Sequence, residues 1–396
     1  MFSDRTGWNL QPNRFSRALA RQRSSGRRLH DLTASNPTGV GLRYDQTKIL
    51  RALSSPAALA YDPQPKGLLS AREAVSAYYR SRSGASAELP APDPEQIILT
   101  ASTSEAYTYV FRLLCNRGDE VLVPRPSYPL FQFLADLQDV RLVAFDLVYD
   151  HGWEVDFHSL ERCLSPRSRA VILVSPNNPT GSYVHPQEAR RLNEICLQRG
   201  IALIGDEVFL DYAVDGELRA SLALNEGALT FTLSGLSKIS GLPQMKLAWL
   251  IVSGGSDERQ KEALARLEVI ADTYLSHNTP TQLAAPALLE TRHEFQRQLR
   301  GRLCANLAEL DRQLAAGGAC SRLLIEGGWY AILRVPSTQP DEELAIRMLE
   351  ERQVLVHPGH FYDFHSEGYL VVSLIPPEEE FACGTRELLG FIADAS

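Results

Sequence analysis

Residues 233–249 read LSGLSKISGLPQMKLAW and decide the interpretation of the whole chain. Lys238 and Lys246 are the only charged residues in this stretch, and the chain has just five lysines among its 40 basic residues. An ammonium group is costly to bury unless it loses its charge or gains a partner. A desolvated lysine has a lowered pKa and can form a Schiff base with a carbonyl compound. The residues alone leave two interpretations open: a reactive lysine, or a surface turn with two solvated lysines.

Short apolar runs alternate with helical stretches on both sides of this segment. Several runs lack polar alternation, which is typical of strands buried on both faces. We therefore expect a doubly wound, mostly parallel α/β sheet with ligands at the carboxyl ends of its strands. Seven runs predict its strands: Ile97–Leu99, Val121–Val123, Arg141–Phe145, Ala170–Val174, Ile201–Ile204, Leu229–Leu233 and Leu247–Val252.

The two ends of the chain predict further elements. An amphipathic helix is expected from about Gln11 to Gln22, and another over Leu68–Arg80, where apolar residues recur at helical spacing. The charged stretch from about Thr281 to Ala315 predicts one helix or two that lead to a smaller domain. That domain is expected to contain three strands and a last helix, namely Tyr330–Val335, Val354–Val356, Tyr369–Leu374 and Glu378–Ala393.

Composition excludes several classes of protein. The net charge of −8 gives no basic field for nucleic acid or an anionic membrane surface. No apolar run approaches the roughly 18 residues of a membrane span. The six cysteines are scattered without a CxxC pair, which favours reduced thiols in a cytoplasmic protein over disulfides or a zinc site. The Arg-rich start lacks the apolar core of a secretory signal, and the first helix is favoured over a transit peptide, which stays open as an alternative.

Polar motifs follow three of the predicted strands. The segment TASTSEA at 100–106 opens a helix, where hydroxyls and free N–H groups either hold a phosphate or simply cap the helix. The segment SPNNPTG occupies 175–181, and GDEVF occupies 205–209. Asp206 and Glu207 point to opposite faces if the strand continues, so we expect no metal site there.

These motifs resemble those of one enzyme family. GLSK at 235–238, GL at 241–242 and KLA at 246–248 resemble the pyridoxal-phosphate attachment segment of class I/II (fold type I) aminotransferases. Asn178 in NPTG and Asp206 match the family's other two anchors, in the same order along the chain. The resemblance extends from about Leu32 to the last helix. It implies a fold type I enzyme with a mostly parallel seven-stranded sheet in a large α/β domain, plus a smaller α+β domain.

The resemblance also implies where the domains begin and end. Residues 1–45 would form an N-terminal helix and an arm that joins the small domain. Residues 46–280 would form the large domain that binds pyridoxal phosphate (PLP), and residues 281–396 the small C-terminal domain. Because the family's sites are shared between subunits, a homodimer is expected, with Tyr61 and Asn278 contributed across the interface.

Roles for individual residues follow from the same resemblance. Lys238 is implied as the catalytic residue, which holds pyridoxal 5'-phosphate as a Schiff base and then moves a proton between the substrate Cα and the cofactor. Asp206 pairs with the ring nitrogen and Asn178 contacts the phenolic oxygen, while Tyr128 stacks on the ring. The residues implied to hold the phosphate are Ser102, Thr103, Ser104, Ser237, Lys246 and, from the neighbouring subunit, Tyr61.

Three positions depart from the family's pattern. Phe209 replaces a common tyrosine and cannot donate a hydrogen bond to the phenolic oxygen, so we expect the Schiff base to stay protonated to higher pH. Lys246 replaces an arginine and loses its bidentate fork. Val371 occupies the place of the arginine that grips the substrate carboxylate. The candidates for that task are Asn36, Tyr330 and His357, together with Arg43 and His360.

We therefore expect an aminotransferase that moves an amino group between an amino acid, or a related amine, and a 2-oxo acid. It would be a cytoplasmic homodimer with no nucleic-acid or membrane partner. A β- or γ-eliminating lyase or a cyclase of the same fold stays open because the carboxylate arginine is missing. A non-catalytic ligand sensor is the third alternative, although no helix-turn-helix segment accompanies the domain. The donor, the acceptor and the pathway stay open.

Overall fold

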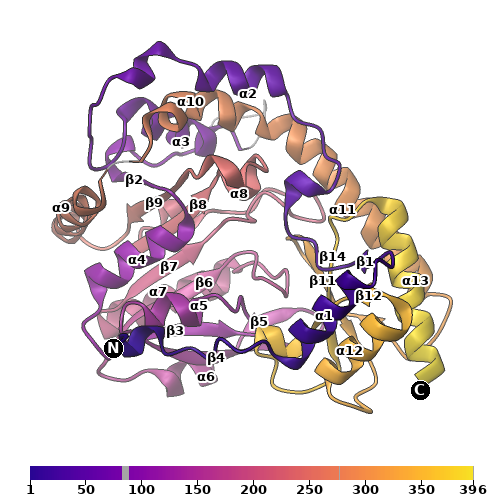
Figure 1. Cartoon of the computed structure of the whole chain (residues 1–396). Coiled ribbons are helices and arrows are strands. Elements are labelled where there is room, and N and C mark those ends of the chain that lie inside the picture. The colour runs from indigo at the N-terminus through magenta and orange to yellow at the C-terminus, as the bar shows by residue number, and fades with distance from the viewer. Residues whose placement is uncertain (83–88, 276, 396) are drawn as a thin grey trace.

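The structure is a computed structural model that describes residues 1–82, 89–275 and 277–395. A central sheet dominates the larger part of the molecule (Figure 1). Its strands follow the order β2-β9-β8-β7-β6-β3-β4-β5. They are β2 (Ile97–Thr100), β3 (Glu120–Arg125), β4 (Arg141–Tyr149), β5 (Trp153–Val155), β6 (Ser168–Val174), β7 (Ala202–Asp206), β8 (Thr230–Gly235) and β9 (Ala248–Ser253).

The strand directions bring most carboxyl ends to one edge of this sheet. Strands β4, β3, β6, β7 and β8 run parallel to one another. Strand β9 is antiparallel to both β8 and β2, so β2 points the same way as β8. The seven predicted strands are therefore confirmed. The sequence did not predict β5, which pairs antiparallel with β4, because three residues are too few to show a period.

Helices cover both faces of the sheet because its strands are apolar on both sides. One face packs against α4 (Thr103–Leu114), α5 (Phe131–Asp136) and α9 (Asp257–Tyr274). The other face packs against two groups of helices. These are α6 (Phe157–Cys163) and α7 (Pro186–Arg199), and then α2 (Gln46–Leu53), α3 (Leu69–Arg80), α8 (Leu236–Ile239) and α10 (Thr279–Glu290).

A smaller sheet domain is built from both ends of the chain. Its four-stranded sheet has the order β10-β11-β14-β13 and contains β10 (Ser321–Arg322), β11 (Tyr330–Arg334), β13 (His357–Pro358) and β14 (Tyr369–Ser373). A separate two-stranded sheet pairs β1 (His30–Asp31) with β12 (Val354–Leu355). The strand predicted over 354–356 therefore joins the N-terminal segment rather than the sheet of β11 and β14.

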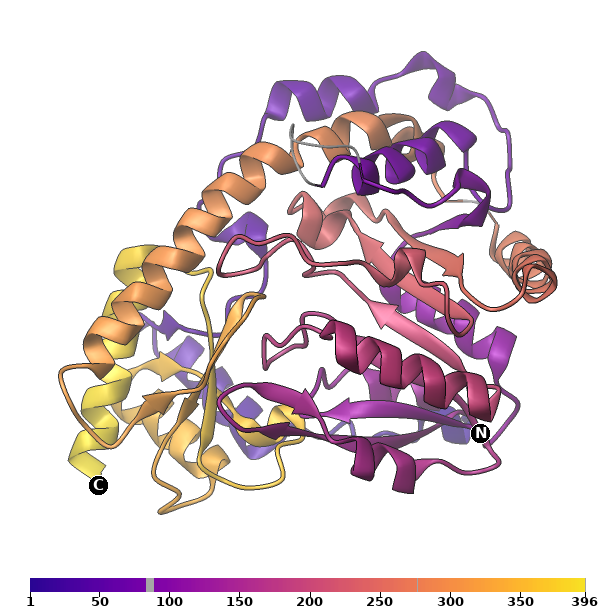
Figure 2. The same ribbon diagram turned by 180° about the vertical axis from the view of Figure 1, so that it is seen from behind.

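Four helices surround these short strands. Helix α1 (Arg14–Ser24) lies beside α12 (Asp341–Arg352), and α13 (Glu378–Ala395) ends the described chain (Figure 1). The long α11 (Arg292–Leu314) runs diagonally from the large sheet to the small domain, as the rear view shows (Figure 2). The stretch predicted as one helix or two is thus two, α10 and α11. Within the described residues, none of the helices has the length and hydropathy needed to cross a bilayer.

Candidate active site

Three adjacent strands bring Asn178, Asp206 and Lys238 to the same edge of the large sheet. Asp206 is the last residue of β7, and Lys238 lies in α8, directly after β8. Asn178 lies in the loop after β6, whose last residue is paired in register with Asp206. In open α/β sheets, this edge is where ligands bind. The geometry places the three residues where a common ligand can reach them.

Lys238 carries an amine in an aromatic and largely dry setting. Its Nζ lies 4.7 Å from the ring centre of Trp329 and 5.5 Å from that of Phe209. Nζ also donates a hydrogen bond of 3.4 Å to the carbonyl of Ser35. Burial lowers the pKa of Lys238 to about 8, against an opposing pull from the negative charge of Asp206. A substantial fraction of this amine is therefore neutral and nucleophilic near pH 8.

Asp206 is a buried carboxylate held by two donors. The hydroxyl of Tyr107 donates to Oδ2 at 3.0 Å, and the backbone N–H of Val208 donates to Oδ1 at 3.2 Å. Burial raises the pKa of Asp206 to about 6, while these hydrogen bonds and Lys238 act in the opposite direction. Such a carboxylate is ionised at neutral pH and can pair with a protonated ring nitrogen.

The loop after β6 presents an amide with unused hydrogen-bonding capacity. Asn178 is 8% exposed, and its Oδ1 has no hydrogen-bond partner among the described residues. Its neighbour Asn177 instead holds the loop together by donating to the Pro126 carbonyl and the Thr180 hydroxyl, each at 3.0 Å. A buried unpaired amide oxygen is unfavourable, and it suggests a polar partner supplied by a ligand. A half-turn of the amide would present the NH₂ group at the same place.

The start of α4 offers hydroxyls and backbone N–H groups. Ser102 caps the helix by accepting a 3.2 Å hydrogen bond from the Glu105 N–H. The hydroxyls of Thr103 and Ser104 donate no hydrogen bond to any described residue, and neither does that of Ser237 beside Lys238. The first N–H groups of a helix have no partner within it and favour anions. This end of α4 can therefore hold a phosphate.

The other residues predicted to bind the cofactor or to lie at the subunit interface differ in their exposure and in their neighbours. Tyr128 is 43% exposed, and its pKa is raised first by burial and then by the negative charge of Asp206, which lies near it. Lys246 is exposed just before β9, and its charge helps to lower the pKa of His277. Tyr61 is 78% exposed and meets no predicted site residue within this chain. Asn278 caps α10 through the N–H of Thr281.

One face of the small sheet lies toward Lys238, and the arginine on that face, Arg334 at the end of β11, packs 5.9 Å from the ring centre of Tyr149. Val371 is directly opposite Ile332 on β11 and His357 on β13. Ser373 is opposite Tyr330 in the same ladder. Residues directly opposite, or two apart on one strand, share a face of the sheet. This face therefore carries Val371, Ser373, Tyr330 and His357.

Two contacts tie this face to the site of Lys238. The ring of Tyr330 lies 6.4 Å from that of Phe209, measured between centroids, and Phe209 is itself beside the Lys238 amine. The Ser373 hydroxyl donates to the Ala34 carbonyl, one residue before the Ser35 carbonyl that Lys238 contacts. The buried Val371 therefore places an isopropyl group on this face, at the position for which the resemblance implies an arginine.

His357 is a neutral donor on this face. The hydroxyl of Tyr362 lies 3.0 Å from its Nδ1. Burial lowers the pKa of His357 to about 4 and raises that of Tyr362 well above its ordinary value. The tyrosine therefore keeps its proton and donates to Nδ1, which leaves the imidazole proton on Nε2.

The other substrate candidates are Asn36, Arg43 and His360. Asn36 accepts hydrogen bonds from the N–H and hydroxyl of Thr38, and it directly follows Ser35, whose carbonyl meets Lys238. Arg43 is exposed, and its backbone is bound by Gln298 of α11. His360 is exposed and packs edge-on against Phe361.

Sequence reasoning missed several residues of the site. Tyr107 holds Asp206, Trp329 lies beside the Lys238 amine, and the Tyr212 hydroxyl donates to the Lys238 carbonyl. Tyr362 fixes the tautomer of His357. These aromatics come from four separate segments, and no local pattern distinguishes them from core residues. The pair Gly327-Gly328 before Trp329 was the one feature of the sequence that indicated close packing of the backbone against another segment.

The residues present fit pyridoxal 5'-phosphate. An amine of lowered pKa can hold an aldehyde, and a buried carboxylate can face a ring nitrogen. The unpaired amide of Asn178 suits a phenolic oxygen, and the start of α4 suits a phosphate. A metal is not needed for this chemistry, and the described residues include no group of three or more His, Cys, Asp or Glu placed to hold one.

Comparisons with known proteins identify the family. Residues 31–380 match the family model described as aminotransferase class I and II. The chain is 26% identical over 387 residues to the glutamate-pyruvate aminotransferase AlaA of Haemophilus influenzae, covering 94% of this chain and 93% of that protein. It is also 26% identical over 385 residues to the alanine aminotransferase of Mycobacterium bovis, covering 94% and 87%.

Solved structures share the fold. The alanine aminotransferase from Pyrococcus furiosus superposes with a TM-score of 0.87 at 21% identity, covering 100% of both chains. An aminotransferase from Escherichia coli gives 0.85 at 22% identity, covering 99% of this chain and 98% of that one. Because the family model spans most of the chain, the protein belongs to the class I and II aminotransferases, fold type I enzymes that use pyridoxal phosphate to transfer amino groups.

Proposed function

We propose that this aminotransferase works through Lys238, Asp206 and Asn178, and that it holds the substrate carboxylate without an arginine. The observation that carries the first part is the pairing of a desolvated amine, with a pKa of about 8, with a buried carboxylate on the adjacent strand. When bound, the cofactor supplies an electron sink for negative charge at the substrate Cα. Asp206 keeps the ring nitrogen protonated, and the side chain of Asn178 binds the phenolic oxygen.

Lys238 is the proposed acid and base. Its Nζ would hold the cofactor aldehyde in the resting enzyme and, once released by the substrate amine, would carry the proton that leaves the substrate Cα. Trp329 and Phe209 flank this amine with apolar rings, and the burial that results favours its neutral form. Ser102, Thr103, Ser104, Ser237 and Lys246 are the proposed phosphate ligands, and Tyr128 the ring-stacking residue.

The substrate carboxylate is proposed to meet neutral donors. Tyr330 and His357 share the strand face of Val371, and Tyr362 holds His357 as the Nε2–H tautomer. Hydrogen bonds from neutral groups bind a carboxylate less strongly than a guanidinium fork does. We therefore propose weak, millimolar-range binding of simple amino acids. Since two relatives are named for alanine and for glutamate and pyruvate, these compounds are the first to test.

A donor screen tests the proposal. Purified holoenzyme is mixed with single amino acids or amines, and the loss of the absorbance band of lysine-bound cofactor is recorded. Transfer predicts conversion to pyridoxamine phosphate, and a 2-oxo acid should then restore the band. Release of ammonia together with an oxo acid would instead favour an eliminating lyase. An unchanged band with every donor would contradict the proposal.

We further propose that the active protein is a homodimer in the cytoplasm. Tyr61 and Asn278 would then reach the neighbouring subunit's site, which agrees with the exposure of Tyr61 in the single chain. All six cysteines are unpaired thiols, which supports a reducing compartment.

A further inference from the structure

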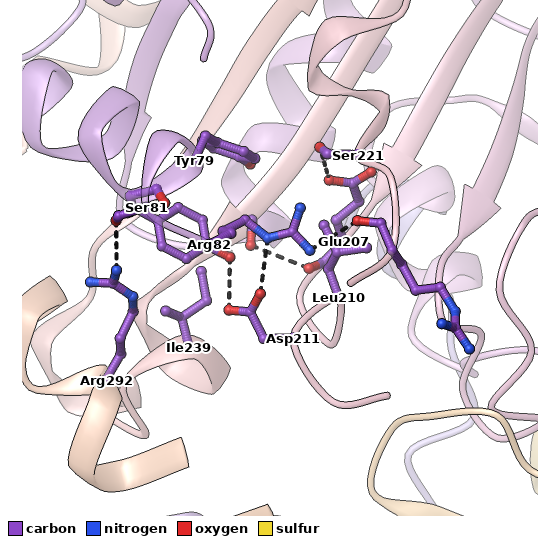
Figure 3. A network of polar contacts seen from close by, with 12 residues as sticks. Tyr79, Ser81, Arg82, Glu207, Leu210, Asp211, Ser221, Ile239 and Arg292 are labelled. Carbon is purple, nitrogen blue, oxygen red and sulfur yellow. Dashed lines mark hydrogen bonds and ion pairs between the residues drawn. The ribbon is translucent and has the colours of Figure 1, made fainter. Parts of the chain in front are cut away.

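A cavity of about 490 Å³ lies behind α8, outside the proposed cofactor site. It opens between the end of α3, the loop after β7 and the first turns of α11. None of the residues assigned above to cofactor or substrate lines it. Figure 3 shows part of its wall, with Arg82, Asp211 and Arg292 grouped between these segments.

The wall of this cavity is strongly basic. Two carboxylate residues, Asp211 and Glu217, line it together with five arginines, namely Arg82, Arg219, Arg292, Arg297 and Arg300. Asp211 is already saturated, because Arg82, Tyr78 and Gln296 all donate to its carboxylate. The Asp211 carboxylate is therefore occupied, whereas the exposed Glu217 carboxylate has no recorded partner among the described residues, so five arginines face one free carboxylate.

Two of the five arginines have no carboxylate partner among the described residues. Arg219 is paired with Asp215, and Arg297 with Glu294. Arg292 donates only to the Leu289 carbonyl, at 3.0 Å, and to the Ser81 hydroxyl, at 2.7 Å. Arg300 donates only to the backbone carbonyl of Asp211, at 2.7 Å. Each of the two guanidinium groups has further N–H donors to offer.

The burial of Arg292 makes this arrangement informative. The residue is only 6% exposed, and its guanidinium packs 5.5 Å from the ring centre of Tyr78. A buried cation is costly without a counter-charge. The carbonyl end of α10 and the Ser81 hydroxyl supply partial negative charge but no full one. An anion in the adjoining cavity would supply the full negative charge that the described residues do not place beside Arg292.

The cavity adjoins the segment that carries Lys238. Gln296 donates both to Asp211 and to the Ile239 carbonyl, each at 3.0 Å. Tyr212, next to Asp211 in sequence, donates to the Lys238 carbonyl. A ligand in the cavity is therefore separated from the backbone of α8 by a single layer of hydrogen-bonded side chains.

We propose that this cavity is a second binding site for a small oxyanion with two or more negative charges, a polycarboxylate or a phosphate, held by Arg292 and Arg300. The planar guanidinium matches both groups through paired N–H donors. Because the site is separate from Lys238, the proposal is independent of the function proposed above.

Calorimetric titration of the holoenzyme with citrate and, separately, with inorganic phosphate tests this. Holoenzyme is used so that the cofactor's own phosphate occupies the start of α4. We expect saturable binding of one equivalent per chain by at least one probe, and the stronger probe identifies the ligand class. Arg300→Gln should weaken it at least tenfold, and Arg292→Gln combined with Arg300→Gln should abolish it.

The exposed Arg300 makes the single variant decisive even if the double variant fails to fold. Arg312→Gln is the matched control, since Arg312 lies on the same helix, is paired with Glu309 and does not line the cavity. It should bind the probe as the unchanged protein does. Absence of saturable binding by both probes, or unchanged affinity in Arg300→Gln, would overturn the proposal.

Discussion

Burial moves the pKa values of Lys238 and Asp206 toward each other, the first down to about 8 and the second up to about 6. Between these values both groups are charged and attract each other. Above about pH 8 the amine is neutral and nucleophilic, and below about pH 6 the carboxyl group is neutral and no longer supports a protonated ring nitrogen. In the protein without cofactor, burial therefore limits the pH range in which both groups are charged to the interval between these two pKa values.

The rate at which the cofactor-free protein captures pyridoxal phosphate should follow the neutral fraction of Lys238. We expect the rate to rise about tenfold per pH unit and to level off near pH 8, because only the unprotonated amine attacks an aldehyde. Stopped-flow absorbance measures it, with Nα-acetyl-lysine as the solvated control. A rise that continues past pH 10, as for the control, would contradict the lowered pKa.

The hydrogen bond from Tyr107 should lower the pKa of Asp206. Tyr107→Phe removes a hydrogen bond that favours the ionised carboxylate, so the pKa of Asp206 should rise. A bond of about 1 kcal/mol corresponds to roughly half a unit to one unit. The acid limb of the kcat/KM profile should therefore move to higher pH by that amount. Tyr149→Phe, far from Asp206, is the control, and equal profiles for both variants would refute the coupling.

Phe209 should set the proton affinity of the cofactor–lysine linkage. Its ring lies 5.5 Å from Nζ and offers no hydroxyl to the phenolic oxygen. Phe209→Tyr should therefore lower the pKa of that linkage by about one unit, the value of one added hydrogen bond. A spectrophotometric pH titration of the two holoenzymes measures the difference. Identical titrations, or a higher pKa in the tyrosine variant, would contradict the hypothesis that Phe209 keeps the pKa of the linkage high.

At the scale of elements, long buried strands were predictable and short ones were not. Runs such as Ala170–Val174 are apolar on both faces, which only a central strand explains. β5 has three residues and was not predicted, and β12 was predicted as a strand but its pairing with the two-residue β1 was not, because tertiary contacts alone define these pairings. The anchors Asn178, Asp206 and Lys238 could be predicted because each lies at or within a few residues of the carboxyl end of a strand. The aromatics Tyr107, Trp329 and Tyr362 were not, since their roles depend on packing between distant elements.

Gly241 should be required for the turn after α8. Its φ is +64°, and an added Cβ would lie 2.1 Å from the ring of Phe295 on α11. Gly241→Ala should therefore cost about 2–4 kcal/mol of unfolding free energy through backbone strain and overpacking. Urea unfolding measures it. Gly301→Ala, in α11 with open space around it, should instead be neutral or slightly stabilising. Equal stability of both variants would be inconsistent with this packing.

At the scale of the whole molecule, the single chain leaves apolar side chains exposed near Tyr61. Leu59 is 92% exposed, Tyr61 78% and Leu50 65%, all on the segment from α2 to the start of α3. Grouped exposure of this kind marks an interface between proteins. It agrees with the homodimer that we propose.

Sedimentation velocity should therefore find particles of twice the 44.0 kDa chain. Leu59→Asp should shift them toward monomers and weaken cofactor retention, because a buried charge disfavours the interface. Leu197→Asp, at an exposed position on α7, should leave the dimer intact. A monomeric parent protein with full activity would exclude shared sites.

The pairing of β1 with β12 has a consequence for synthesis on the ribosome. Leu32 is fully buried in the same core as Val354 and Phe381, and Arg14, Arg21 and Arg28 form ion pairs with glutamates at 343, 350 and 380. The strands of the large sheet have all been translated by residue 253, whereas the ion-pair and strand partners of α1 and β1 lie at residue 343 and beyond. The nascent segment of α1 and β1 therefore has to wait for these partners through most of translation, and a chaperone could shield its apolar residues during that time.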